Sequence, residues 1–254
     1  MSLSLLGRGR WGAFLGVFLF VDAWAGAFKV LPLGLTLEGD RTSAALRLIN
    51  TGEAPVTVQV EAVAWTQDER GTDRYAPTGE LIYFPRLLTL GAGAEGVVRV
   101  AYQGPTVAGR ERAFRLYAEE IPEPDGKRWR MALRLGVPVF VRPARLGPAR
   151  WRLRRVEVHP GRVTVRVENP GARHARIRRV LLRDAGGAWS QAVAGWYLLP
   201  GASRVFEMHL PRPHCRRGRP LEVVVEGTEG RRARRRIEAT GCVDSVSPSA
   251  RASG

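Results

Sequence analysis

The segment Trp129–Pro143, WRMALRLGVPVFVRP, carries the pattern that decides the fold. From Trp129 to Val137, large apolar side chains alternate with arginine and small residues, and this period of two predicts a strand with one apolar face. Pro138 and Pro143 limit further ladder bonding, which favours the edge of a sheet. Soluble proteins usually cover a long apolar edge strand. We therefore expect another part of this chain, or a partner protein, to cover it.

The same alternation recurs on both sides of this segment. Short strand-like stretches such as Ala44–Ile49 and Val56–Trp65 are separated by Gly, Pro, Asn and Asp, and helical periodicity is nearly absent. This pattern predicts an all-β protein made of immunoglobulin-like β-sandwiches. The polar, turn-rich stretch Thr66–Gly79 is predicted as a loop, and the proline-flanked stretch Ala144–Ala149 as an interdomain link. We expect one domain at residues 28–143, a second at 144–242, and a disordered tail at 243–254.

The first 27 residues have the features of an export signal. Arg8 and Arg10 precede an apolar run from Trp11 to Trp24, and the small residues 25–27, Ala-Gly-Ala, form a cleavage signal. The run is shorter than the ~20 residues that a membrane span needs. We therefore expect a cleaved signal peptide rather than an anchor, and no stable membrane insertion after cleavage.

The chain is strongly basic, with a formal net charge of +16. Such a balance suggests nucleic-acid binding. However, the cations are nearly all arginines scattered through the strand-like stretches, with lysine only at Lys29 and Lys127 and one dense run at 231–236. We therefore expect no nucleic-acid partner. Attraction to anionic surfaces remains a second hypothesis.

Two cysteines, Cys215 and Cys242, are present. In an exported protein an even pair favours a disulfide, which would contribute roughly 3 kcal/mol by constraining the unfolded chain. Free thiols or a metal-binding pair are the alternatives. Because no histidine lies at a ligand spacing from either cysteine, we expect no metal site and no cofactor.

Seven segments, taken in order, resemble those of the periplasmic pilus-assembly chaperones of the chaperone–usher pathway. They are LRLINTGEAPVTVQVEAVAW (46–65), LTLGAGAEGVVRV (88–100), RERAFRLYAEEIP (110–122), ALRLGVPVFVRP (132–143), VRVENPGARHARI (165–177), LLPGASRVF (198–206) and GRPLEVVVEG (218–227). The resemblance implies a periplasmic protein of two immunoglobulin-like domains in a boomerang arrangement with a cleft between them. It also implies a function without catalysis.

The resemblance further implies how a partner is bound. A strand of the first domain is donated to an incomplete pilus or fimbrial subunit, which the chaperone delivers to an outer-membrane usher. Here the donor strand would present four apolar side chains, each worth about 1.5–3 kcal/mol when buried. These residues are Trp129, Met131, Leu133 and Leu135. The alternative is that this face packs in the core of its own domain.

The sequence departs from the family at a basic pair that holds the subunit's terminal carboxylate. The two positions are Gly34 and Pro138 here. Four other cations are candidate substitutes for this pair. They are Arg99, Arg86, Arg115 and Lys29. These departures indicate a divergent, non-classical member.

The resemblance also implies a structural ion pair between the domains, Glu111 with Arg142. The acid of the second domain that would join this pair falls near His214 and Cys215 and is missing.

Other functions find less support in the residues. The chain has no nucleophile elbow, no phosphate-binding glycine loop and no metal-ligand cluster, which argues against an enzyme. A second hypothesis is an exported binding or adhesion protein that uses its arginines on anionic surface polymers. A third is a stress-type periplasmic chaperone without an usher.

Overall fold

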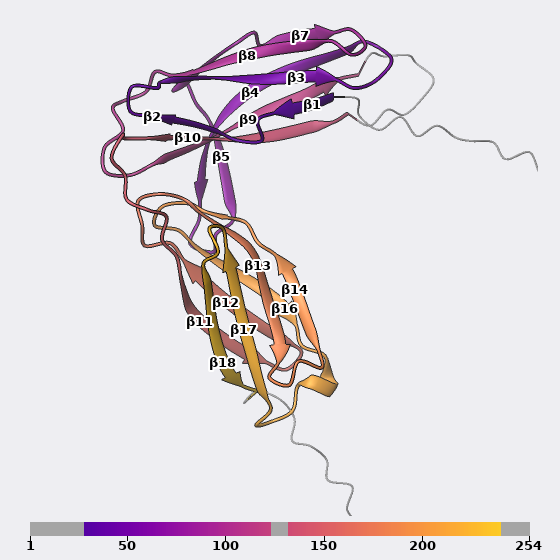
Figure 1. Ribbon diagram of the computed structural model, residues 1–254, viewed down its shortest axis with the longest axis vertical. Coiled ribbons are helices and arrows are strands. Elements are labelled where there is room, and N and C mark those ends of the chain that lie inside the picture. Colours follow the sequence, from indigo (N-terminus) through magenta and orange to yellow (C-terminus); the bar gives the residue numbers. More distant parts are fainter. Residues whose placement is uncertain (1–27, 123–131, 240–254) are drawn as a thin grey trace, which may run out of the picture.

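The computed structural model describes residues 28–122 and 132–239. The predicted signal peptide and tail lie outside these ranges, as do Trp129, Met131 and Cys242. The described chain folds into two β-sandwich domains that meet at an angle, so the predicted all-β fold and boomerang arrangement are confirmed (Figure 1). No helix in the described ranges is long and apolar enough to cross a membrane.

The first domain packs two sheets face to face. One sheet has the order β1 (Phe28–Leu31), β3 (Ser43–Asn50), β8 (Glu95–Tyr102), β6 (Leu81–Phe84). The other has the order β2 (Leu35–Glu38), β10 (Arg134–Arg142), β9 (Arg112–Ile121), β4 (Val56–Gln67), β5 (Asp73–Pro77), and β7 (Leu87–Leu90) also pairs with β4. Alternate side chains of each sheet fill the space between them, as the period of two requires. The centre of this core is made by Leu46, Leu48, Val98, Val100 and Leu116.

The second domain repeats the plan with fewer strands. One sheet has the order β11 (Arg152–His159), β12 (Arg162–Glu168), β16 (Ser203–His209). The other has the order β14 (Ser190–Ala194), β13 (Ala175–Asp184), β17 (Pro220–Gly227), β18 (Arg232–Glu238), and β15 (Tyr197–Leu198) pairs with β13. A short 3-10 helix, Arg212–His214, leads to Cys215. Cys215 is buried in the core and disulfide-bonded, although its predicted partner lies outside the described residues.

Two strands were not predicted. Strand β5 lies inside Thr66–Gly79, which the sequence pattern predicts as a loop, and β14 lies in a stretch of small and polar residues. Four of the five residues of β5 are exposed, so there is no buried face to produce an apolar alternation. Strand β5 forms because β4 continues past its apolar part and pairs with it from Val63 to Gln67.

A buried asparagine closes a loop in each domain. In the first domain, Asn50 Nδ2 donates to the carbonyls of Ala54, Leu90 and Gly91 at 2.8–2.9 Å, and Asn50 Oδ1 accepts from the Gly52 amide. In the second, Asn169 makes the same contact with Gly171 and donates to two further carbonyls. Each side-chain amide therefore satisfies several backbone groups at once.

Replacing Asn50 with alanine should destabilise the first domain. The change leaves buried carbonyls without a donor, which costs about 1–3 kcal/mol, and the urea unfolding midpoint should fall accordingly. Thr57→Ala is the control, because its hydroxyl pairs with Thr89 on the exposed surface. Equal midpoints for the two variants would contradict this role of Asn50.

Candidate partner-binding site

Strand β10 is paired on only one side over its first half. Strand β9 pairs with it from Arg134 to Val141, whereas β2 pairs with it only from Val139 to Arg142. Within the described residues, the other backbone edge of residues 134–138 has no strand partner. Such an edge can accept an additional strand through main-chain hydrogen bonds.

The apolar side chains of this segment lie at the margin of the first domain's core. Leu133 and Leu135 are half-buried and pack against the core, and Val137 is inside it with 2% of its surface exposed. From Val137 onward the strand therefore completes the core of its own domain. Leu133 and Leu135 keep part of their surface accessible beside the unpaired edge.

The two positions that lack the expected basic pair lie side by side. A Cβ atom on Gly34 would stand 3.5 Å from Cγ of Pro138. On the neighbouring strand, Arg115 is the direct cross-strand partner of Pro138. Because paired residues of a sheet project to the same face, the structure places a cation one strand away from the site where the resemblance implies one.

Arg115 is buried in an aromatic environment, with only 7% of its surface exposed. Its guanidinium carbon lies 4.4 Å from the ring centre of Trp65 and 5.6 Å from that of Trp196. Nη1 donates to the Gly136 carbonyl at 3.2 Å, while Nε and Nη2 are buried and have no hydrogen-bond partner. A guanidinium with unused N–H groups is suited to bind a carboxylate.

The other three candidate cations lie elsewhere. Lys29 on β1 and Arg99 on β8 are exposed on the four-stranded sheet, on the opposite side of the first domain's core. Arg86 lies between β6 and β7 and covers the Tyr83 ring at 5.2 Å. Of the four, Arg115 alone lies at the junction of the two domains.

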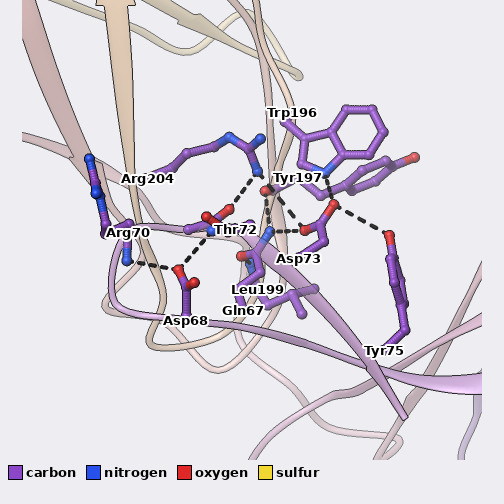
Figure 2. Close-up of polar contacts among 11 residues, drawn as sticks. Gln67, Asp68, Arg70, Thr72, Asp73, Tyr75, Trp196, Tyr197, Leu199 and Arg204 are labelled. Carbon is purple, nitrogen blue, oxygen red and sulfur yellow. Dashed lines mark hydrogen bonds and ion pairs between the residues drawn. The ribbon is translucent and has the colours of Figure 1, made fainter. Parts of the chain in front are cut away.

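The junction is closed by a polar network around the end of β4 and β5 (Figure 2). Gln67 Nε2 donates to the Tyr197 carbonyl and Gln67 Oε1 accepts from the Leu199 amide, both at 2.9 Å. Trp196 Nε1 donates to Asp73 at 2.7 Å. These bonds hold Trp196 of the second domain over Arg115 of the first.

Tyr75 extends this network toward Arg115. Burial raises the pKa of Tyr75 to about 12, an effect that the positive charge of Arg115 partly opposes. The phenol is therefore neutral at physiological pH, and its hydroxyl group points to Asp73 at 3.4 Å.

Glu111 and Arg142 do not pair with each other as the resemblance implied. The Glu111 carboxylate is buried and accepts the backbone N–H of His174 at 3.0 Å, and His174 Nδ1 lies 2.6 Å from the same oxygen. Arg142 donates to Glu38, its cross-strand neighbour on β2, at 2.7 Å. This hydrogen bond lowers the pKa of Glu38. Glu111 thus links the domains through His174, and Arg142 braces the β2–β10 pair within the first domain.

The sequence pattern did not identify four residues of this junction. They are Gln67, Asp73, His174 and Trp196. Gln67 and Asp73 lie where a loop was predicted, and His174 and Trp196 show no spacing that suggests a site. Their roles follow from the contact between the domains. Within the described residues, no cluster of His, Cys, Asp and Glu could hold a metal ion.

Comparison with solved structures shows the same two-domain fold. A chain of the complex of the CsuC chaperone with the CsuE tip adhesion subunit from Acinetobacter baumannii is 20% identical, with a TM-score of 0.62, over 83% of this chain and 97% of that chain. The CupB2 chaperone of Pseudomonas aeruginosa is 19% identical with a TM-score of 0.53, over 83% of this chain and 100% of that chain. A chain of the complex of the SafA pilin with the SafB chaperone of Salmonella enterica is 16% identical with a TM-score of 0.57, over 84% and 97%.

A search of curated proteins gives no match to the sequence. Residues 27–147 match the family model described as the N-terminal domain of PapD, a pili and flagellar-assembly chaperone. The first domain therefore belongs to the N-terminal domain family of the pili and flagellar-assembly chaperones, as a divergent member.

Proposed function

We propose that this protein is a periplasmic chaperone that captures pilus subunits by strand addition along β10 and delivers them to an outer-membrane usher. Pilus chaperones of this family are periplasmic. The observation that carries the proposal is the unpaired backbone edge of residues 134–138. The half-buried side chains of Leu133 and Leu135 lie beside this edge. An added strand would gain main-chain hydrogen bonds from this edge and would bury both leucine side chains.

Two of the similar structures support this proposal. Each contains a chaperone together with a pilus component, CsuC with a tip adhesion subunit and SafB with the SafA pilin. Addition of a strand to β10 is a binding event made of backbone and apolar contacts, so the function requires no catalytic group.

Arg115 is the proposed carboxylate anchor of this site. A buried charge interacts more strongly with an opposite charge than an exposed one does, because less water screens it. The free N–H groups at Nε and Nη2 would donate hydrogen bonds to the terminal carboxylate of a subunit once Trp196 moves aside. Trp196 is about one third exposed, and its displacement would break its hydrogen bond to Asp73.

A second candidate function, binding to anionic surface polymers, is favoured by the outer face of β18. Arg232, Arg234 and Arg236 lie in one row there, beside Glu222 and Glu226 of β17. If this row carried the function, binding would fall steeply with salt and would not depend on the leucines of β10.

Replacing Leu133 with aspartate should abolish capture of a co-expressed subunit. A charge at this position cannot be buried in an added strand, so the yield of periplasmic subunit and its co-purification with the tagged chaperone should fall at least tenfold. Leu87→Asp is the matched control, because Leu87 is an exposed leucine on β7. Undiminished capture by a folded Leu133→Asp variant would disprove strand addition at β10.

Replacing Arg115 with glutamine should weaken binding only of partners that end in a free carboxylate. The contact is charge-assisted and worth about 1.5–3 kcal/mol, so the Kd for a peptide copy of a subunit's last strand should rise ~10- to 100-fold. The same peptide with an amidated C-terminus should bind wild type and variant equally.

Arg99→Gln serves as the control for lost charge, because Arg99 is exposed on the other sheet. If Arg115→Gln and Arg99→Gln have the same effect, or if the amidated peptide is equally affected, Arg115 is not the anchor. Thermal unfolding of each variant separates loss of binding from loss of structure.

A further inference from the structure

A cavity of about 250 Å³ lies on the outer face of the β11–β12–β16 sheet, away from the β10 edge. The floor is formed by side chains of these three strands. Arg70, in the β4–β5 loop of the first domain, lines one side. This loop is held against the second domain, since the Val205 amide donates to the Arg70 carbonyl at 3.3 Å. Both domains therefore contribute to the cavity.

Like charges are brought together at the end of the cavity near Arg70. Arg155 on β11 is directly opposite Arg166 on β12, and opposed like charges destabilise a sheet. Arg166 also reaches toward the first domain, where its Nη1 donates to the Glu69 carbonyl at 3.3 Å. Three arginines thus converge on one row of the sheet, an arrangement that an anion would stabilise.

Each acid of the cavity already pairs with an arginine, and neither pairs with Arg70 or Arg166. Glu157 lies 2.9 Å from Arg155 and also accepts the Thr164 hydroxyl at 3.3 Å. Glu207 lies 3.8 Å from Arg162. Among the described residues, no carboxylate forms an ion pair with Arg70 or Arg166. Four arginines outnumber two glutamates around the cavity, so its charge remains positive after these pairs form.

We propose that this cavity binds a phosphate-class anion between Arg70 and Arg166. A guanidinium presents two parallel N–H groups that match the oxygens of a phosphate. Arg155 lies opposite Arg166 in the same row and is itself paired with Glu157, and Thr164 lines the same space. The volume exceeds that of a single phosphate ion, so the group fits as part of a larger molecule, either a soluble phosphate ester or a lipid headgroup.

Binding at this site would connect the two domains. Arg70 belongs to the first domain, and Arg155 and Arg166 belong to the second. An anion held between them would add a link between the β4–β5 loop and the second domain. The site does not depend on subunit capture, so it can be tested in the full chain without a subunit.

The first experiment measures binding of inorganic phosphate to the full chain at constant ionic strength, by calorimetry and by thermal unfolding. Phosphate should raise the unfolding midpoint of the wild type relative to sodium chloride. Arg166→Gln and Arg70→Gln should each weaken binding about tenfold, because each removes one charge-assisted contact. Arg178→Gln is the matched control, since Arg178 is exposed on β13 in the other sheet.

The second experiment separates the two sources of the phosphate group. Sedimentation is measured with vesicles of phosphatidylcholine alone and of phosphatidylcholine with phosphatidylglycerol. Binding to the anionic vesicles that Arg166→Gln weakens and Arg178→Gln preserves would indicate a lipid headgroup, whereas binding of free phosphate alone would indicate a soluble ester. Absence of both interactions, or equal losses for Arg178→Gln and Arg166→Gln, would overturn the proposal.

Discussion

The contact between the two domains is the interaction on which the rest of the structure depends. Trp65, Phe140 and Leu199 form a buried apolar cluster at the junction. The Phe140 ring stacks on His174 with 3.6 Å between ring centres, and Glu111 holds His174 from the first domain. Apolar burial supplies most of the attraction, while the directed bonds of Gln67 and Glu111 select one orientation. This orientation determines what covers Arg115 and where the β4–β5 loop meets the second domain.

Strand β10 takes part in three functions of the fold. Its Val137, Val139 and Val141 side chains lie in the core of the first domain, and Phe140 lies in the interdomain cluster. The preceding residues offer an unpaired backbone edge. A strand that is fixed at one end by two packed surfaces can present its other end in a defined direction with little loss of conformational entropy on binding. The proposed binding edge is therefore rigidly supported rather than carried on a loop.

Much of the fold was predictable because the alternation of apolar and polar side chains can be read within each strand, without knowledge of its partners. The segments around Leu46, Val58 and Val165 each bury every second residue, and their strands were predicted to within a few residues. Strand β5 was missed because its residues are exposed. The site was less predictable, since its geometry depends on long-range contacts. The candidate list included Arg115, but only the register of β9 with β10 places it beside Pro138. No sequence pattern indicated that Glu111 would meet His174 instead of Arg142.

The position of Pro138 and the start of the β2 pairing have a consequence for partner selection. Pro138 has no amide hydrogen to donate, and from Val139 onward β2 already occupies the edge. A strand added along residues 134–138 must therefore terminate where β2 begins. A steric stop of this kind sets the register of the added strand by the position of its end. At the two positions where the resemblance implies a basic pair, this chain has Gly34 and Pro138 instead. If β10 receives a subunit strand as proposed, a strand longer by one residue would present the wrong side chains beside Leu133 and Leu135, so strand length itself becomes a selectable property.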